Sequence, residues 1–171
     1  MPKPWHRPVR HRQRQFSKVQ GWKPGERTLR FSAMASGKIS ALIRPSVGSI
    51  PPDQWDALGG GANPFISHAF LAALEESGSV GPESGWQSAP LVLEGQDGTL
   101  LAAAPSYLKE HSQGEFVFDY AWADAWMRAG GDYYPKALSA IPFTPVPGPR
   151  TLIAPDADAD AVRAQLAIGW R

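Results

Sequence analysis

The spacing of hydrophobic residues changes from strand-like to helix-like after the first forty positions. KISALIRP, residues 38–45, alternates apolar and polar side chains until its proline, which predicts a β-strand. IPPDQWDAL, residues 50–58, has proline in its first turn and apolar residues three apart, which predicts a short helix. After a break at GGGAN, residues 63–78 predict the clearest helix, with Asn63 as its cap and Pro64 at its first position.

A loop and then a β-hairpin are expected in the middle of the chain. The loop is GSVGPESGWQSA, residues 78–89. APLVLE (89–94) and TLLAAAPSYL (99–108) are apolar runs on either side of GQDG, whose residues tolerate the backbone angles of a tight turn. Pro105 implies a bulge or an edge position in the second strand, because proline cannot donate a ladder hydrogen bond.

The last third of the chain predicts further alternating elements. EFVFD, residues 115–119, reads as a strand with Phe116 and Phe118 on one face. Trp122 and Trp126 are four apart, so they share a face of a helix that Asp119 would cap. Tryptophans so placed pack in a core more often than they bind a ligand.

The chain is predicted to end with two strands and a helix. The strands are KALSAI and PRTLIAP, and the helix is DADADAVRAQLAIGW, which Asp156 or Asp158 would cap. Taken in order, these elements predict an α/β or α+β fold with a layered mixed sheet. There is no GxGxxG fingerprint, no Walker lysine loop and no HExxH motif, so the sequence predicts neither a doubly wound nucleotide fold nor a metal site.

Composition supports one domain with a substantial core. The chain has 171 residues, of which 43% are hydrophobic, and it contains no cysteine, which excludes disulfides and thiolate chemistry. No apolar run is long enough to cross a membrane, and no apolar segment follows the basic start as in a secretory signal. We therefore expect a cytoplasmic location.

Charge divides the chain into two parts. Residues 1–44 hold eleven of the 17 Lys and Arg residues and one acid, whereas the remainder holds six bases and fifteen acids. Residues 1–37 lack apolar periodicity and are interpreted as a disordered basic extension, with the domain at 38–171. Met34 opens a segment that looks like the natural start of a protein, so the residues before it are interpreted as an upstream extension of the reading frame. The alternatives for this basic head are a nucleic-acid-binding arm and a transit peptide.

Polar groups that can do chemistry gather between residues 107 and 150. His111 with Glu115 or Asp119 is interpreted as a pair of histidine and carboxylate close in sequence, and such a pair can act as a general base. The alternative is that this segment is a solvated loop. His68, in the predicted helix over 63–78, is interpreted as a partly buried histidine that makes one hydrogen bond rather than as a ligand or base.

Several long motifs resemble a bacterial family. They are NPFISHAFLAALEESG, AAAPSYLKEHSQGEFVFDYAWADA and YYPKALSAIPFTPVPGPRTL, and the resemblance runs from about Ile39 to Ala167. The family is the FemAB-like group, labelled peptidoglycan biosynthesis/recognition proteins or GNAT-family N-acyltransferases. It implies an acyl-CoA N-acyltransferase (GNAT)-like fold and the transfer of an acyl or aminoacyl group to an amine, with acyl-CoA or aminoacyl-tRNA as the donor.

The resemblance also implies what this chain lacks. Family members usually carry two such units in tandem, and this chain resembles the first unit, so we expect an incomplete fold without the second unit's pyrophosphate-binding loop. No cofactor is expected to bind this chain alone, and the chain can be inactive. Such a half can also expose an apolar surface and self-associate. A non-catalytic module that recognises cell-wall peptide or a protein partner is the alternative function.

Binding residues are expected within the matched motifs. The expected substrate contacts carry hydroxyl, cationic or aromatic groups that can hold a cell-wall precursor: Tyr134, Lys136, Thr144, Arg150 and Trp122. The alternative for the loop residues among them is that they only tie their own segment to the domain.

Overall fold

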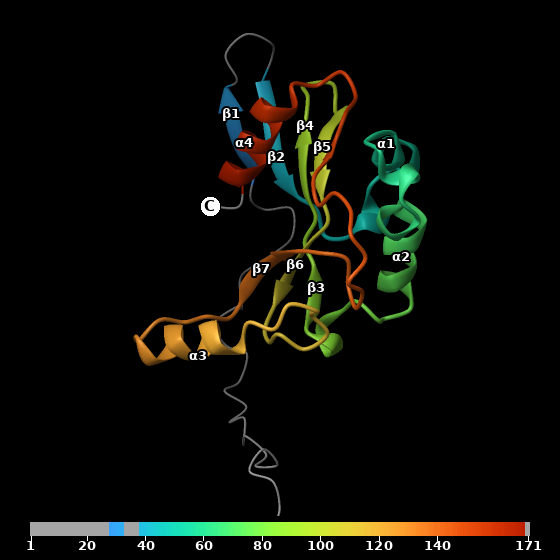
Figure 1. Ribbon diagram of the computed structural model, residues 1–171. Coiled ribbons are helices and arrows are strands. Elements are labelled where there is room, and N and C mark those ends of the chain that lie inside the picture. The colour runs from blue at the N-terminus through green and yellow to red at the C-terminus, as the bar shows by residue number, and fades with distance from the viewer. Residues whose placement is uncertain (1–27, 33–37, 170–171) are drawn as a thin grey trace, which may run out of the picture.

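The structure is a computed structural model that describes residues 28–32 and 38–169. Its strands form two sheets, and every strand pairing in the described part of the chain is antiparallel. Helices lie beside these sheets (Figure 1). The fold is therefore α+β, as the sequence predicts, with antiparallel sheets in place of the mixed sheet. Within the described ranges, no helix is long and apolar enough to cross a bilayer.

The larger sheet has the strand order β1-β2-β4-β5-β8. Its strands are β1 (Thr28–Ser32), β2 (Lys38–Ile43), β4 (Leu91–Glu94), β5 (Leu100–Ala104) and β8 (Leu152–Ile153). The predicted hairpin is present, because β4 pairs with β5 across the GQDG turn. Successive side chains of β4 point to opposite faces, so Val92 packs on one side of the sheet and Leu91 and Leu93 pack on the other.

Helices cover both faces of this sheet. Helix α4 (Ala159–Gly169) packs against Leu91 and Leu93, while α1 (Pro52–Ala57) and α2 (His68–Glu76) lie on the face of Val92 (Figure 1). A side chain at position 169 would meet the Leu91 methyl groups at about 3.2 Å, so the glycine there allows α4 to approach the sheet closely. The predicted cap of α4 is confirmed, because the Asp158 carboxylate accepts from the backbone N–H of Asp160 and Ala161.

The smaller sheet has the order β3-β6-β7 and lies beyond Pro105. Its strands are β3 (Trp86–Ser88), β6 (Ser106–Lys109) and β7 (Lys136–Ser139). The apolar run predicted as one strand therefore divides at Pro105 into β5 of the larger sheet and β6 of the smaller one. Because proline donates no ladder hydrogen bond, it stands where the chain leaves one sheet for the other.

The predicted helix over residues 63–78 is two helices. Asn63 caps a 3₁₀ turn, η3 (Pro64–Ile66), by accepting from the Phe65 N–H, and Ser67 then caps α2 by accepting from the Phe70 N–H. The described residues contain three further 3₁₀ turns: η1 (Val47–Ser49), η2 (Gly60–Ala62) and η4 (Pro82–Ser84). The break changes which residues are buried, so Ile66 and Leu71 enter the core while Ala69 is exposed.

Replacing the cap of α2 gives a first prediction. Ser67→Ala removes the acceptor for a first-turn N–H and is expected to lower the free energy of unfolding by about 1 kcal/mol. Urea denaturation measures this loss. Ser79→Ala, at an exposed serine outside the helices, is the matched control and should change stability by less than about 0.5 kcal/mol. Equal losses in both variants would contradict the capping role.

The segment EFVFD is not a strand, and this prediction is wrong. It belongs to the loop between β6 and α3 (Tyr120–Arg128), and its aromatic residues Phe116 and Phe118 are exposed. The preceding chain turns at Gly114, whose φ of +76° is a left-handed conformation that glycine adopts without strain. The turn directs Glu115 inward, and no strand of the described residues pairs with the segment after it.

Helix α3 projects from the body of the molecule instead of packing into it (Figure 1). Trp122 is 77% exposed and Trp126 is 57% exposed, so the expected core role of these tryptophans is wrong. They do share a helical face, as predicted. Asp119 stands at the N-cap position, but its side chain makes no capping hydrogen bond because its carboxylate is used elsewhere.

Two strands were not predicted. Thr28–Ser32 lies in the segment interpreted as a disordered head, yet it forms β1, which pairs with β2 from Thr28 opposite Leu42 to Ser32 opposite Lys38. The remainder of that head, residues 1–27 and 33–37, lies outside the described residues, as do the hypotheses of a nucleic-acid arm and a transit peptide. Strand β3 lies in the predicted loop and brings Trp86 into the core.

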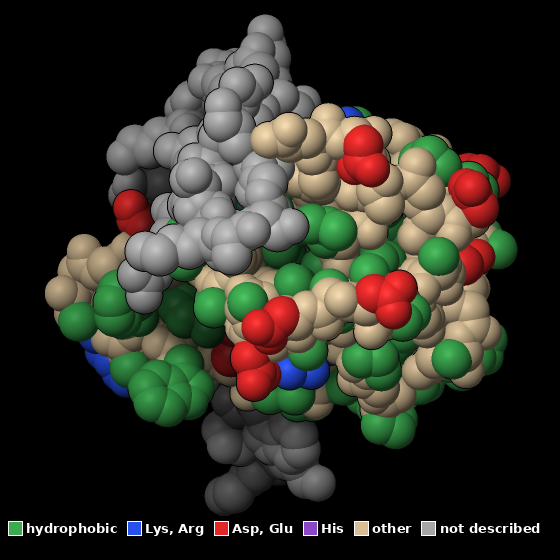
Figure 2. Space-filling view, turned by 90° about the horizontal axis from the view of Figure 1, so that it is seen from above, with side chains coloured by type: hydrophobic (Ala, Val, Ile, Leu, Met, Phe, Trp, Pro, Cys, Tyr) green, Lys and Arg blue, Asp and Glu red, His purple; other side chains and the backbone are tan. Residues whose placement is uncertain are grey.

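Charge on the described surface agrees with the acid excess of the sequence after residue 44. Figure 2 shows one face on which acidic side chains are scattered among apolar and backbone atoms, with few basic atoms between them. The described residues on this face show no concentrated positive patch.

Candidate ligand-binding site

The polar centre of the smaller sheet is formed by one strand and the loop that faces it. Lys136 begins β7 and lies directly opposite Lys109 at the end of β6. The loop after β6 brings acidic and hydroxyl groups against Lys136, and the two tyrosines just before β7 close the other side. We call this group the Lys136 cluster: Ser112, Glu115, Asp119, Tyr133, Tyr134 and Lys136.

Lys136 uses all of its hydrogen-bonding capacity inside the cluster. Its Nζ donates to Ser112 Oγ at 2.9 Å, to Glu115 Oε2 at 2.7 Å and to Asp119 Oδ2. A lysine ammonium has three donors and no acceptor. Since each donor has a partner, Lys136 holds the loop and orients its carboxylates, and it has no donor left for a ligand.

The hydroxyl groups complete the network around Asp119. Ser112 Oγ donates to Asp119 Oδ1 and lies 2.7 Å from Tyr134 OH, which therefore donates to it. Tyr133 OH donates to Asp119 Oδ2 at 2.7 Å. Both oxygens of Asp119 are thus paired.

One oxygen of the Lys136 cluster stays unpaired. Oε1 of Glu115 is buried and has no hydrogen-bond partner among the described residues, whereas Oε2 is paired with Lys136. The residue as a whole is only 9% exposed. A buried acceptor without a donor is costly, so a preformed carboxylate oxygen of this kind favours a site that a ligand donor completes.

The electrostatics of the cluster keep Asp119 ionised. Burial alone would raise its pKa, but hydrogen bonds from Lys136, Ser112 and Tyr133 outweigh burial and lower the pKa to about 2. Burial likewise would lower the pKa of Lys136, and its contacts with Asp119 and Glu115 outweigh that effect and raise it. A carboxyl group with so low a pKa is a weak base, so Asp119 serves to fix Lys136.

His111 does not reach the two carboxylates that the sequence placed near it. No hydrogen bond in the described structure joins it to Glu115 or Asp119; its Nδ1 accepts from the backbone N–H of Gln113, and its ring lies against Gly85. Burial and the nearby Lys109 ammonium lower the pKa of His111. Histidine and carboxylate therefore do not form the predicted catalytic pair.

Lys109 is a second buried lysine beside the cluster. Its Nζ donates to the carbonyl of Gln113 at 2.9 Å and lies 3.9 Å above the ring of Trp86. Burial lowers the pKa of Lys109 to about 8, although the Glu115 carboxylate acts in the opposite direction. Lys109 and Lys136 together offset the charges of the two acidic residues.

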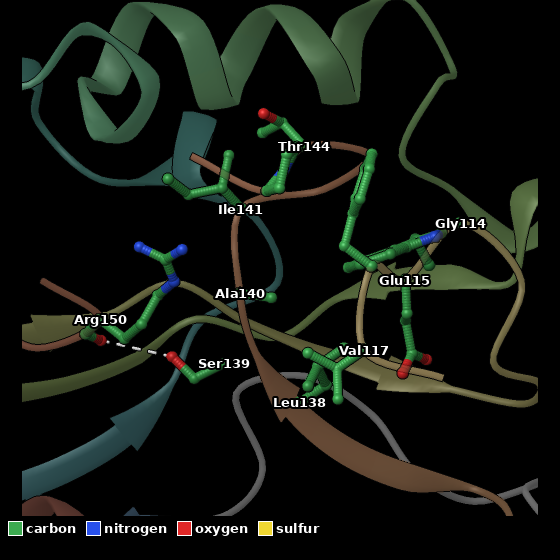
Figure 3. Close-up of a pocket in the computed structure, with 12 residues that line it drawn as sticks. Gly114, Glu115, Val117, Leu138, Ser139, Ala140, Ile141, Thr144 and Arg150 are labelled. Atoms are coloured by element: carbon green, nitrogen blue, oxygen red, sulfur yellow. Dashed lines mark hydrogen bonds between the residues drawn. The ribbon is translucent and has the colours of Figure 1, made fainter. Parts of the chain in front are cut away.

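Glu115 also lines a cavity of about 430 Å³. Figure 3 shows Gly114 and Glu115 on one side of it and Arg150 and Ile141 on the opposite side. The walls include apolar side chains such as Val117 and Leu138 and the buried indole of Trp86. The cavity thus combines apolar surface with a few polar groups, as small-molecule sites do.

Thr144 and Arg150 both line this cavity, but most of their polar contacts are with their own loop. Arg150 Nη2 donates to the Val146 carbonyl at 2.8 Å and Nη1 donates to the Gly148 carbonyl at 3.0 Å. Thr144 Oγ1 accepts from the Val146 N–H. These contacts hold the proline-rich loop in place. Holding the loop is the role that the sequence analysis gave as the alternative for both residues. The contacts also fix the rim of the cavity.

The structure brings together five of the eight sequence candidates around Glu115. Tyr134, Lys136 and Asp119 are in the cluster with it, and Thr144 and Arg150 line the cavity that it shares. His111 lies apart, as described above, and Trp122 does not line the cavity.

The exposed aromatic residues near Trp122 predict self-association. Phe116, Val117, Phe118, Tyr120, Trp122 and Trp126 are all more than half exposed. Apolar surface of this kind tends to be buried against a partner. Trp122→Ala/Trp126→Ala should therefore move the protein toward the monomer in light-scattering measurements after size exclusion. A wild-type protein that is monomeric at every concentration would contradict the prediction.

His68 has the structural role that the sequence interpretation gave it. Its Nε2 lies 3.0 Å from the Val47 carbonyl and 2.9 Å from the Ile50 carbonyl, so its N–H is shared between them. The side chain is buried and ties α2 to η1.

Sequence reasoning missed Trp86 and Ser112. Neither residue is among the candidates selected from the sequence, because each acquires its role from contacts with distant segments: Ser112 with Lys136 and Tyr134, and Trp86 with Phe143. One clue was available for Trp86, because a lone tryptophan after a glycine in a polar loop is seldom left in solvent.

Comparison with known proteins agrees with the resemblance in the sequence. Residues 46–171 match the FemAB-like family, which is described as peptidoglycan biosynthesis/recognition. No curated protein and no solved structure matches the chain significantly. The match covers most of the chain, including the cavity and the Lys136 cluster. The chain therefore belongs to the FemAB-like family of peptidoglycan biosynthesis and recognition proteins.

Proposed function

We propose that this protein recognises a peptidoglycan precursor through a free amine of that precursor, which enters the cavity and donates to Glu115 Oε1. The observation that carries the proposal is the unpaired, buried Oε1 of Glu115, a residue that lines the cavity. A carboxylate oxygen only accepts hydrogen bonds, so its partner must be an N–H or O–H group of the ligand. An ammonium group adds charge attraction to the hydrogen bond and is the strongest such partner.

The rest of the site supports this role of Glu115. Lys136 fixes the carboxylate through Oε2 and leaves Oε1 without a hydrogen-bond partner among the described residues. The apolar walls at Val117, Leu138 and Ile141 suit the aliphatic part of an amine-bearing side chain. Family membership supplies the substrate class, since peptidoglycan peptides carry free amines.

Calorimetry tests this proposal. A soluble muropeptide with a free side-chain amine should bind, and the same muropeptide with that amine acetylated should bind at least ten-fold more weakly, because it cannot bring a cation to Oε1. Equal affinity for both muropeptides, or no binding of either at millimolar concentration, would contradict amine recognition.

The second candidate function is transfer of an acyl or aminoacyl group to this amine by a GNAT-type unit. Of the predicted catalytic residues, Glu115 has an oxygen without a partner in the described structure, and it can take a proton from the ammonium. The nitrogen would then attack the carbonyl carbon of a thioester or ester donor. The new C–N bond forms as the C–S or C–O bond breaks, and the second proton of the nitrogen ends on the leaving group.

Mass spectrometry separates transfer from recognition alone. The chain is incubated with the free-amine muropeptide and either an acyl-CoA or an aminoacyl-tRNA. Addition of the acyl or aminoacyl mass to the muropeptide supports transfer. Binding without any mass change supports the non-catalytic recognition module.

A further inference from the structure

Trp86, which lines the same cavity, carries a second unpaired polar atom. Its side chain is 1% exposed, and its Nε1 finds no acceptor within the described ranges of the chain. The indole ring itself is held firmly: Tyr107 packs edge-on against it at 5.3 Å between ring centroids, and the Lys109 ammonium lies 3.9 Å above it. An indole N–H can only donate, and one that is buried without an acceptor is rare in folded proteins.

Phe143 closes the site around this N–H group. Its ring lies 5.3 Å from the Trp86 ring, and a side chain at Gly114 would meet Phe143 at 2.8 Å and Trp86 Nε1 at 3.0 Å. Phe143, Gly114 and the indole N–H therefore converge on one point. The glycine is required there because no other residue leaves room for the phenyl ring beside Nε1.

Phe143 is also held in an unfavourable backbone conformation. Its φ is +60°, and within the described residues it is the only non-glycine residue with positive φ. A bulky residue in the left-handed region has a strained backbone. Such strain persists where the contacts of the surrounding structure hold the residue in that conformation. The side chain is 41% exposed, so its ring can move into solvent without displacing the core.

We propose that Phe143 is a gate over a carbonyl-binding subsite in which Trp86 Nε1 donates to an oxygen of the ligand. The ligand chemistry follows from the donor: an indole N–H can only donate, so its partner is an acceptor oxygen, and the amide carbonyl is the neutral acceptor that a peptide ligand supplies. Movement of the phenyl ring away from the indole uncovers Nε1. The cavity then binds two groups of the ligand, an amine at Glu115 and an amide carbonyl at Trp86.

Nuclear magnetic resonance of the indole N–H groups tests the subsite in the full chain. Acetamide, which has a carbonyl but no amine, and ethylamine, which has an amine but no carbonyl, serve as probes. Acetamide should shift the Trp86 indole resonance saturably toward the position of a hydrogen-bonded indole, and ethylamine should leave it unmoved. The resonance is assigned by through-bond experiments and by its loss in Trp86→Phe.

Phe143→Ala tests the gate. Without ligand, the Trp86 N–H should exchange with water at least ten-fold faster in this variant than in the wild type, and acetamide should bind more tightly. Phe65→Ala is the matched control, because Phe65 is 37% exposed and packs on Phe70 away from the cavity. Both effects should be absent in the control.

Each of the following results would overturn the inference: no shift with acetamide, an equal shift with ethylamine, or unchanged exchange or acetamide affinity in Phe143→Ala. A shift confined to the variant would mean that the ligand does not open the gate of the native protein, which also overturns it. Because acetamide has no amine, failure here leaves amine recognition by Glu115 intact, and failure of the muropeptide titration leaves this subsite intact.

Discussion

Lys136→Met is expected to lower the free energy of unfolding by about 3 kcal/mol at pH 7, one of the two largest effects that the structure predicts. The variant keeps the aliphatic volume of the side chain but removes the ammonium that Glu115 and Asp119 share. Both carboxylates are largely buried, and a buried charge that loses the cation paired directly with it is strongly destabilising. Denaturation with urea at pH 7 measures the loss.

The pH dependence of this effect identifies its cause. The pKa of Asp119 falls from 3.8 to about 2 on folding, so its contribution to stability is present above about pH 4 and is lost as the pH falls through 2. The raised pKa of Lys136 acts in the opposite sense, since its contribution is complete below 10.5 and is lost as the pH rises further. The difference between wild type and Lys136→Met should therefore shrink below pH 4.

An exposed ion pair provides the control for Lys136. Arg163 pairs with Asp160 on the surface of α4, and Arg163→Met should cost less than about 0.5 kcal/mol at pH 7. A cost for Lys136→Met that is as small as this, or one that stays constant down to pH 2, would show that the cluster does not depend on its central charge.

Glu115→Gln is expected to weaken binding of the free-amine muropeptide by ten- to a hundred-fold. The substitution keeps the shape of the side chain but replaces a carboxylate oxygen with a neutral amide. A hydrogen bond to a charged group is worth about 1.5–3 kcal/mol, and about 1.4 kcal/mol corresponds to a factor of ten in affinity. Calorimetry gives the two dissociation constants, and circular dichroism confirms that the variant is folded.

Glu110→Gln is the matched control for this substitution. Glu110 lies on the same loop, and none of its side-chain atoms takes part in the described hydrogen bonds of the Lys136 cluster. Glu110→Gln removes the same single negative charge from the protein, and it should leave the affinity for the free-amine muropeptide within a factor of two of the wild-type value. If both variants lose affinity equally, the effect is one of net charge, and the specific role of Glu115 Oε1 is refuted.

Much of the fold follows from local patterns. The hairpin of β4 and β5, the proline-started α1 and the Asp158-capped α4 each have their cause within a few residues of sequence, in turn composition, capping or periodicity. Pro105 also predicted a bulge or an edge position in the second strand, although the sequence could not show that the chain passes from one sheet to the other there. Local rules predict such elements because local hydrogen bonds decide them.

The errors arise where distant contacts override the local pattern. EFVFD has the alternation of a strand, but Glu115 is drawn to Lys136 and its neighbours stay in solvent. Trp122 and Trp126 have helical spacing, yet spacing does not tell whether anything packs on the face that they form. β3 is only three residues long and exists because β6 lies beside it.

The candidate site was predicted only in part, because its contacts also join residues that are distant in the sequence. Sequence proximity suggested a pair of His111 with Glu115 or Asp119, whereas the two carboxylates instead meet Lys136, 21 and 17 positions away. Lys136, Tyr134, Thr144 and Arg150 were selected as polar residues within long motifs, and the fold gathers them near Glu115. Only tertiary structure shows that Lys136 is saturated and that Glu115 keeps one free oxygen.

A crystal structure of the protein with the free-amine muropeptide tests amine recognition most directly. The account predicts that the amine nitrogen lies in the cavity within about 3.2 Å of Glu115 Oε1, with Lys136 still bound to Oε2. An amine that points into solvent or binds another residue while Oε1 stays unpaired would contradict the account.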